Sequence, residues 1–505
     1  RGVPAGRWRV PGPVLCAADA PSPDRCWSDR GGYVGGFEAV WNPHGFEVPA
    51  AQLDGLDPLV HWLLHCGREA LAEVRTRPAR VGAVVGNLGF PSESMADYAD
   101  RVWRGLPPGD PRNRAMSGGT AALLAQALGL TAGSWCLDAA CASSLYAIKL
   151  ACDALADGEA DLMLAGAVQR ADDLFLHLGF AALGALSRSG QSRPFHCEAD
   201  GLLPAEGCAL LALKRLDDAR RDGDTIHAVI RGIGLSNDGR GKGLLVPDAS
   251  GQRRAMQAAL ADARIDPAQV SLLECHATGT PVGDGTELIS TAQVYGARPL
   301  AIGSLKSNLG HLITAAGAAG LIKLTEALRH GVLPPNRAVD APIAALVASS
   351  FRLLQQPEPW PADAPRIAAP VPTTRLSLEG TVPGKPAPKR AAPTEARPSA
   401  APTVGGMAGA ADSPAQPSAW HEGRPSQSVP QAVPQSVSAR TATPVSRPVA
   451  STTYALLTRV TAPCPSQKTG PPESPGHSRD VCCPCANWNL RFCPVPIDVL
   501  RRVQP

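Results

Sequence analysis

The sequence lacks a long hydrophobic run, an excess of charge of either sign and a regular cysteine pattern. No stretch of about 18 or more apolar residues occurs, so nothing predicts a membrane-spanning helix. The 48 basic and 45 acidic residues give a formal net charge of +3, which argues against partners such as nucleic acid or anionic membranes. Residues 1–10 do not resemble an export signal, and singly spaced cysteines before residue 300 favour reduced thiols. We therefore expect a cytoplasmic protein with small or protein-borne substrates.

Proline is distributed unevenly along the chain. About half of the 50 prolines lie after residue 369, in sequence dominated by Pro, Ala, Ser, Thr and Gln. Such sequence buries too little apolar surface to offset chain entropy, so we expect 366–505 to be mostly disordered. The cysteines there lack a paired second C-x-x-C, which favours free thiols over a zinc site. They are Cys464, Cys482, Cys483, Cys485 and Cys493.

Between residues 81 and 354, short apolar runs alternate with segments of helical periodicity. This alternation is typical of an α/β protein. A charged turn at 217–224 divides it into two blocks, which predicts a first lobe at 1–216 and a second at 217–365. The runs expected to form strands are 81–85, 135–137, 162–167, 226–233, 270–275 and 299–303.

A cysteine, Cys141, lies where the expected strand at 135–137 passes into an amphipathic helix. The N-terminus of a helix favours thiolate over thiol and can lower the pKa of a cysteine placed there. Its free amides can also bind a developing oxyanion. Taken alone, such a cysteine is more often a buried structural residue.

Two histidines also follow expected strands. His276 ends the run at 270–275 and precedes a Gly- and Thr-rich loop, whereas His311 follows 299–303 and precedes a helix rich in small residues at 315–320. Ligands gather at the C-terminal ends of strands in α/β proteins. Each histidine alone is more often structural. One cysteine and two histidines at three strand ends nevertheless predict a shared reactive centre.

These three segments resemble the three signatures of the β-ketoacyl synthase (ketosynthase) family. The family's signatures read approximately D-x-A-C-S-S-S, E-x-H-G-T-G-T and K-S-N-x-G-H. In the same order, this chain has D-A-A-C-A-S-S at 138–144, E-C-H-A-T-G-T at 274–280 and K-S-N-L-G-H at 306–311. The resemblance extends over about 4–368 and is to ketosynthases of bacterial type I polyketide and polyunsaturated fatty acid synthases.

The resemblance implies a thiolase-like α/β fold, in which two similar lobes form a layered α-β-α-β-α core. It also implies a β-ketoacyl-[acyl-carrier-protein] synthase, which is an acyltransferase of polyketide or fatty acid biosynthesis. Cys141 would take an acyl group from a thioester, with its own amide stabilising the oxyanion. A malonyl-type thioester would then undergo decarboxylative Claisen condensation with the acyl group, while His276 and His311 donate hydrogen bonds to the enolate.

Further expectations come from the same resemblance. Lys306 matches a lysine that supports the histidine pair, and Thr278 and Thr280 match positions that contact phosphopantetheine. Without the motifs, the lysine would be read as a solvated surface residue and the threonines as loop caps. The domain would bind no metal or cofactor, because its substrates are carried on the phosphopantetheine of an acyl carrier protein or on CoA. Expected partners are that carrier protein, an acyltransferase and other synthase domains or chains, and a second copy in a homodimer, but neither nucleic acid nor membrane.

The chain departs from the family pattern at both ends. It lacks a strand like P-I-A-I-V-G-M at the start and a closing segment like S-x-F-G-F-G-G-T-N-A-H. The resemblance stops near Ala368, which suggests a truncated start and a shifted reading frame with a tail that is not selected sequence. Two other interpretations stay open: a thiolase, which would use one histidine and a second cysteine, and a catalytically inactive ketosynthase remnant or docking module.

Overall fold

The computed structural model describes residues 1–8, 12–16, 25–88, 101, 105, 118–171, 176–238, 246–371, 374–379 and 454–457. The chain divides into two units, Arg1–Pro383 with Ala450–Pro505, and Gly384–Val449. Every described residue belongs to the first unit, and the cysteine cluster predicted to be free thiols at 464–493 lies outside the described residues. Within the described part, no helix is both long enough and apolar enough to cross a membrane.

The first half of the sheet has the strand order β2-β1-β3-β4. These strands are β2 (Ser134–Leu137), β1 (Val81–Gly86), β3 (Leu162–Gln169) and β4 (Gly207–Arg215). β1 pairs in parallel with β2 and β3, and β4 pairs antiparallel with β3. All residues of β1 and β3 are buried, as expected of strands that are covered on both faces.

The second half repeats this pairing pattern. β6 (Leu272–Cys275) pairs in parallel with β7 (Ala301–Gly303) and with β11 (Ile367–Val371), and β12 (Thr374–Glu379) pairs antiparallel with β11. β5 (Ala228–Leu235) pairs antiparallel with β12. The six strands expected between residues 81 and 303 are therefore confirmed, with bounds shifted by a few residues.

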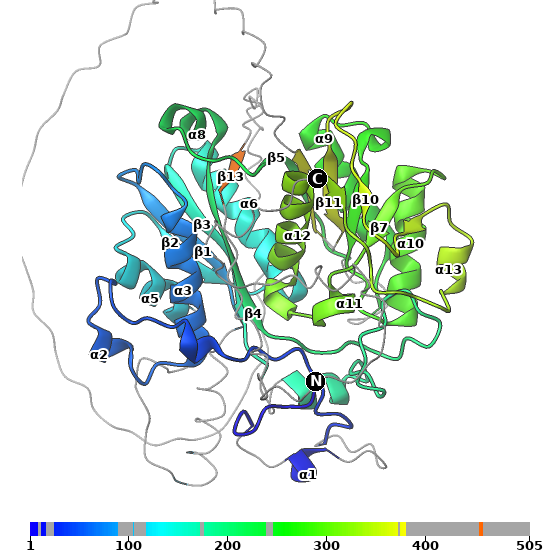
Figure 1. The fold of residues 1–505 in the computed structure, drawn as a ribbon, viewed down its shortest axis with the longest axis horizontal. Helices are drawn as coiled ribbons and strands as arrows, with labels where there is room; N and C mark the ends of the chain where they lie inside the picture. The colour runs from blue at the N-terminus through cyan, green and yellow to red at the C-terminus, as the bar shows by residue number, and fades with distance from the viewer. Residues whose placement is uncertain are drawn as a thin grey trace, which may run out of the picture. The chain divides into compact units, whose positions relative to one another are not determined.

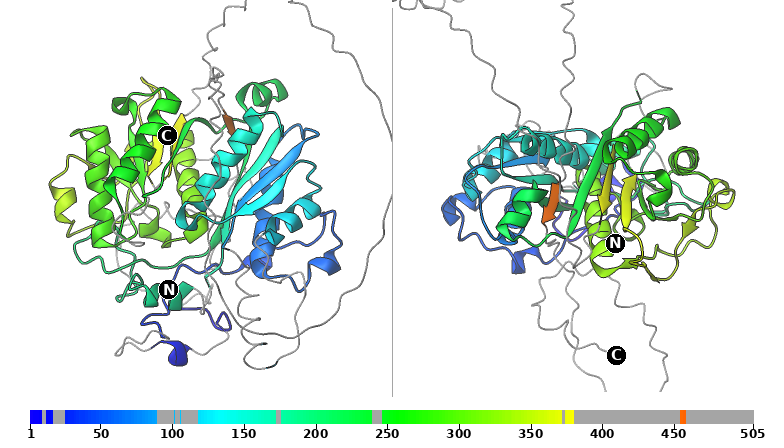
Figure 2. Two further views of the ribbon diagram at one scale, coloured as in Figure 1. Left: turned by 180° about the vertical axis from the view of Figure 1, so that it is seen from behind. Right: turned by 90° about the horizontal axis from the view of Figure 1, so that it is seen from above.

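Two helices, α6 (Ser143–Ala156) and α12 (Ala316–His330), pack against each other between the two halves of the sheet (Figure 1). The alternation of side chains along β1 shows how the layers form: Val84 joins the core made with α6 and α12, whereas Ala83 and Val85 join a second core on the opposite face. That second core includes α3 (Pro58–Ala72) and α5 (Gly119–Leu128), and the second half is covered on its outer face by α9 (Ala249–Ala263) and α10 (Pro281–Tyr295) (Figure 2). The predicted α-β-α-β-α layering is confirmed.

The remaining elements are short. Most of the charged turn expected at 217–224 is a helix, α8 (Leu216–Asp222), which is followed by a left-handed glycine, Gly223. The short elements are α1 (Gly12–Leu15), α2 (Ala50–Leu53), α7 (Leu178–Ala182), α8 (Leu216–Asp222), α11 (Lys306–Leu309), α13 (Ala344–Val347), β8 (Val332–Leu333), β9 (Arg352–Leu353) and β10 (Glu358–Pro359).

A strand from the far end of the chain, β13 (Tyr454–Leu457), joins the two halves. It pairs antiparallel with β4, as β5 does with β12, so it occupies in the first half the position that β5 occupies in the second. It also pairs antiparallel with β5, which makes the sheet continuous over eleven strands.

The tail that we expected to be mostly disordered, 366–505, contains three strands among its described residues. β11 and β12 extend the second half of the sheet beyond 365, and β13 lies in the tail as well. Composition averaged over 366–505 hides these short runs, and the edges of β6, β5 and β4 offer backbone groups that need partners. The rest of the tail lies outside the described residues, and the lobe boundaries at 216 and 365 remain predictions.

The pairing of β13 predicts a difference between two truncations. A chain of residues 1–457 keeps β13, whereas residues 1–453 leave β4 and β5 without this neighbour. Because each lost backbone hydrogen bond costs about 1 kcal/mol net, the shorter chain should be less stable by a few kcal/mol. Urea unfolding of the two chains measures this, and equal midpoints would contradict the placement of β13.

Candidate active site

Cys141 lies in a tight turn between β2 and α6. A 3-10 turn, Ala140–Ala142, carries it, and Ala140 adopts a φ of 49°, a left-handed conformation that alanine rarely takes. Two side chains brace the turn: the Asp138 carboxylate accepts a hydrogen bond from the Ala140 N–H at 2.9 Å, and the Ser143 hydroxyl donates to the Ala140 carbonyl at 2.7 Å. The sequence thus holds Cys141 at the start of a helix, as predicted.

His276 follows β6 and is fixed through its backbone. The Glu287 carboxylate, on α10, accepts hydrogen bonds from the N–H groups of His276 and Ala277 at 2.7 and 2.8 Å. Nearby, Asp284 accepts from the Phe195 N–H at 2.8 Å. Both carboxylates are buried, and burial raises the pKa of Glu287 to about 7 and that of Asp284 to about 6. These two acids hold the loop that presents His276.

His311 follows α11, at the equivalent end of the neighbouring strand β7. Its backbone N–H donates to the Leu203 carbonyl at 2.7 Å, in the loop that precedes β4. Its side chain is 1% exposed. Gly310, directly before it, has a φ of 84°, and a Cβ there would lie 2.7 Å from the Leu203 carbonyl oxygen. Only glycine therefore allows this close approach of the two segments.

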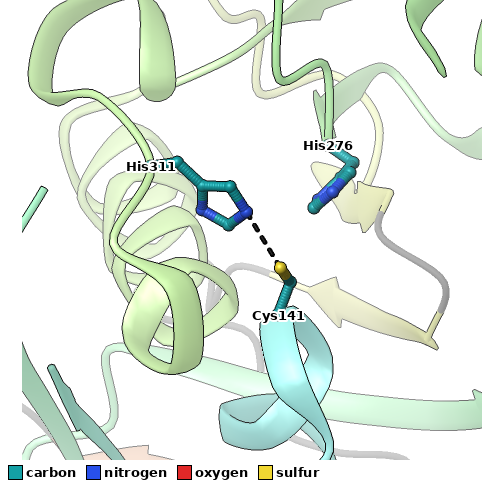
Figure 3. A group of neighbouring side chains, drawn as sticks. All are labelled: Cys141, His276 and His311. Atoms are coloured by element: carbon teal, nitrogen blue, oxygen red, sulfur yellow. Dashed lines mark hydrogen bonds between the residues drawn. The ribbon is translucent and has the colours of Figure 1, made fainter. Parts of the chain in front are cut away.

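The structure brings Cys141, His276 and His311 together, with their side chains directed toward one another (Figure 3). The Nε2 atom of His311 lies 3.0 Å from the Cys141 sulfur, and the two imidazole rings are edge to face with centroids 5.4 Å apart. The reactive atoms of all three residues lie within 4.8 Å of one another. A single acyl group on the sulfur would thus lie within reach of both rings.

Burial sets the charge state of all three groups. It raises the pKa of Cys141 to about 11, although the Lys306 cation and a backbone amide act in the opposite direction. The lowered thiol pKa expected from the helix N-terminus is therefore wrong, because desolvation outweighs it. Burial and the Lys306 charge also lower the pKa of His276 to about 3 and that of His311 well below its usual value. Both imidazoles are neutral near pH 7.

The hydrogen bonds of His311 assign its tautomer. Its Nδ1 accepts a hydrogen bond from the Ile313 N–H at 3.1 Å, so the proton of the neutral ring is on Nε2. The Nε2–H group therefore donates to the Cys141 sulfur. This donor favours negative charge at the position it faces, whether on the sulfur or on an oxygen that takes its place.

Cys141, His276 and Lys306 line one pocket. Lys306 is 7% exposed, which excludes the alternative of a solvated surface lysine. Burial lowers its pKa, and the charges of Glu274 and Glu287 oppose that shift. The remaining lining residues are Glu274, Cys275, Ala316, Gly317, Gly320 and Pro370.

Sequence reasoning missed three residues of this site. The Glu274 carboxylate accepts hydrogen bonds from the Leu305 N–H at 2.5 Å and from the Lys323 ammonium at 2.7 Å. The first of these bonds fixes the backbone at Leu305, directly before Lys306. The sequence offered a pattern for Glu274, which is the first residue of the E-x-H motif. No neighbouring sequence pattern points to Lys323 on α12. Pro370 belongs to β11, which was assigned to the tail.

Thr278 and Thr280 lie on the loop beyond His276. Their hydroxyl oxygens are 3.0 Å apart, and both side chains are partly exposed. Neither is among the described residues that line the pocket. Thr280 precedes α10, but its side chain makes no capping hydrogen bond there. Their contact with a phosphopantetheine arm remains a prediction.

Zinc also accepts one cysteine and two histidines as ligands. Such a site would need a lone pair on each coordinating nitrogen. In this arrangement the Nε2 of His311, the atom nearest the sulfur, carries the proton, since Nδ1 is an acceptor. The hydrogen bonding therefore fits acyl chemistry on the sulfur better than metal coordination.

Comparison with known families identifies the chain. The model of the β-ketoacyl synthase N-terminal domain matches residues 3–219, and that of the β-ketoacyl synthase C-terminal domain matches residues 227–340. The chain belongs to the β-ketoacyl synthase family, whose fold is thiolase-like.

Proteins similar to this chain in sequence or in structure are polyketide synthases or ketosynthases. Polyketide synthase GfsA of Streptomyces halstedii is 35% identical over 73% of this chain, and a mycocerosic acid synthase-like polyketide synthase of Mycobacterium tuberculosis is 37% identical over 73%. This chain spans only 5% and 18% of their respective lengths. Among solved structures, the PfaC keto synthase–chain length factor has a TM-score of 0.69 at 34% identity, covering 76% of this chain and 45% of its own. The oxazolomycin ketosynthase domain OzmH KS7 of Streptomyces albus has a TM-score of 0.66 at 28% identity, covering 76% and 70%.

The raised pKa of Cys141 predicts how its alkylation depends on pH. Since only the thiolate reacts, the rate with iodoacetamide should rise about tenfold per pH unit from 7 to 10. The measurement is the difference in carbamidomethylation rate between wild-type protein and Cys141→Ala. A plateau near neutral pH would instead indicate a stable thiolate and contradict the dominance of burial.

Proposed function

We propose that the chain is a β-ketoacyl-[acyl-carrier-protein] synthase, which transfers an acyl group to Cys141 and condenses it with a malonyl-type thioester. One observation carries the proposal: the protonated Nε2 of His311 lies 3.0 Å from the Cys141 sulfur, and a ring nitrogen of His276 lies within 4.8 Å of both atoms. Membership of the β-ketoacyl synthase family supports it independently.

The first step loads the acyl group. The Cys141 sulfur attacks the thioester carbonyl, a new carbon–sulfur bond forms, and the original one breaks to release the donor thiol. The carbonyl oxygen becomes an oxyanion during this step. The Cys141 N–H, which faces the Cys141 sulfur, supplies a hydrogen bond for it. A thiol pKa of about 11 means that the sulfur loses its proton only as substrate binds or at the moment of attack, and that proton ends on the departing sulfur.

The second step forms the new carbon–carbon bond. The malonyl-type thioester loses carbon dioxide, and the electrons left behind form an enolate whose carbon attacks the acyl group on Cys141. The carbon–sulfur bond to Cys141 then breaks, which returns the cysteine as a thiolate. The enolate oxygen accepts hydrogen bonds from neutral imidazoles, for which His311 offers its Nε2–H and His276 lies beside it. Burial is the main reason that the pKa of both histidines is lowered, and Lys306 has a supporting role because its charge acts in the same direction.

The substrates and partners follow from the relatives. Their names describe polyketide synthases, and they are many times longer than this chain. We therefore infer that substrates arrive on the phosphopantetheine of an acyl carrier protein, passing Thr278 and Thr280, or on CoA. An acyltransferase, other synthase domains or chains and a second copy in a homodimer are proposed as partners. The cytoplasmic location stays a prediction.

Two alternatives are weaker on specific observations. A thiolase would use one histidine and a second cysteine, whereas here two neutral histidines face one sulfur; Cys275 lines the pocket but directly precedes His276. An inactive remnant was favoured by missing core strands. β11 and β12 complete the second half of the sheet, and β13 takes the place of the first missing strand.

The test uses the full chain, a medium-chain acyl-CoA and intact mass spectrometry. Wild-type protein should gain one acyl mass, and Cys141→Ala should gain none. The matched control is Cys275→Ala, which removes the other thiol of the same pocket and should still be acylated. Folded protein without an adduct, or an adduct lost only in Cys275→Ala, would contradict the proposed function.

A further inference from the structure

A second pair of reactive groups lies apart from the active site. The sulfur atoms of Cys16 and Cys26 are 2.8 Å apart, which is closer than the roughly 3.5–4.0 Å at which non-bonded heavy atoms normally rest. Cys16 directly follows α1 and is partly exposed, whereas Cys26 is 1% exposed. The pocket of Cys141 does not include either residue. The acyl chemistry leaves this pair unexplained.

The backbone holds the two residues in register. Cys16 and Cys26 form a parallel bridge, and the Cys26 N–H donates to the Leu15 carbonyl at 2.8 Å. Paired extended segments lie about 4.8 Å apart, inside the roughly 4.4–6.8 Å between Cα atoms that a disulfide needs. Joining the sulfurs therefore requires no rearrangement of the backbone.

We propose that Cys16 and Cys26 are an oxidation site, at which a peroxide forms an intrachain disulfide between them. The thiolate of one cysteine attacks a peroxide oxygen, the oxygen–oxygen bond breaks, and a sulfenic acid and hydroxide result. The sulfur of the second cysteine then attacks the sulfenic sulfur, losing its proton, and water leaves. The two sulfurs together lose two electrons, and the peroxide gains them.

The environment of the pair assigns the two roles. The hydrogen bond from Cys16 lowers the pKa of Cys26, while the same contact raises that of Cys16. Of the two thiols, Cys26 therefore ionises more readily and is assigned the attack on the peroxide, with Cys16 as the resolving thiol. In a contrasting pair, Cys66 and Cys208, both cysteines are buried between α3 and the sheet, whereas Cys16 is partly exposed. Burial and the contact with Cys66 both raise the pKa of Cys208. We expect that pair to stay reduced.

The disulfide would fix a segment that packs close to the active site. Leu15 and Cys26 belong to a hydrophobic cluster with Ala181 and Leu186, at and after α7. Phe180, also on α7, packs against this cluster and against a second one, which Cys141 also contacts. Oxidation would therefore tether the segment that supports one side of α7, and reduction would release it.

Tryptic mapping of the full chain tests the proposal. Cleavage after Arg9, Arg25 and Arg30 places Cys16 in peptide 10–25 and Cys26 in peptide 26–30. After treatment of native protein with hydrogen peroxide and alkylation of the remaining thiols, the two peptides should appear joined, two hydrogens lighter than their sum. Dithiothreitol should separate them.

Variants define the outcomes. The linked pair should be absent from Cys16→Ser and equally from Cys26→Ser, and it should persist in Cys197→Ser, which removes an exposed cysteine outside the pair. The proposal would be overturned if peptides 10–25 and 26–30 appear separately and alkylated at a peroxide concentration that oxidises Cys197. A Cys26 that accumulates as sulfinic acid in wild-type protein would also overturn it, as would cross-links from Cys16 to any other cysteine. Each readout is independent of acyl transfer.

Discussion

The contact between α6 and α12 is the constraint on which the site depends. A Cβ at Gly317 would lie 2.6 Å from the Leu145 side chain, so only glycine lets the two helices approach this closely. The Ser144 hydroxyl accepts a hydrogen bond from the Ala318 N–H at 3.0 Å, which links the first turns of both helices. Because Cys141 and His311 each precede one of these helices, the contact places their side chains 3.0 Å apart.

The same packing removes water from the reactive groups. In these surroundings neutral forms are favoured: the thiol keeps its proton, both imidazoles lose theirs, and the buried Lys306 cation strengthens the effect on the histidines. A centre of neutral hydrogen-bond donors suits a reaction whose negative charge exists only on intermediates. An imidazolium there would be desolvated and repelled by Lys306, since burial and that charge both lower the pKa of the histidines.

The features that the sequence predicts correctly depend on local patterns. The strands before Cys141, His276 and His311 are short apolar runs. Other features depend on distant partners and carry no local signal.

β11, β12 and β13 are strands because β6, β5 and β4 offer unpaired edges, although their own composition indicates a tail. The bond between Lys323 and Glu274 joins residues 49 positions apart. The pKa of Cys141 depends on burial by the second half of the molecule, so the helix N-terminus alone gave the wrong direction.

The central claim is that two neutral histidines serve the enolate while Cys141 holds the acyl group. The most direct measurement is carbon dioxide release from a malonyl thioester by protein already acylated on Cys141. For His276→Ala and His311→Ala, the account predicts a rate lower by about 10²–10³, the usual cost of losing one donor to a developing negative charge, with acylation of Cys141 retained. Release at the wild-type rate in both variants, each still acylated, would contradict the account.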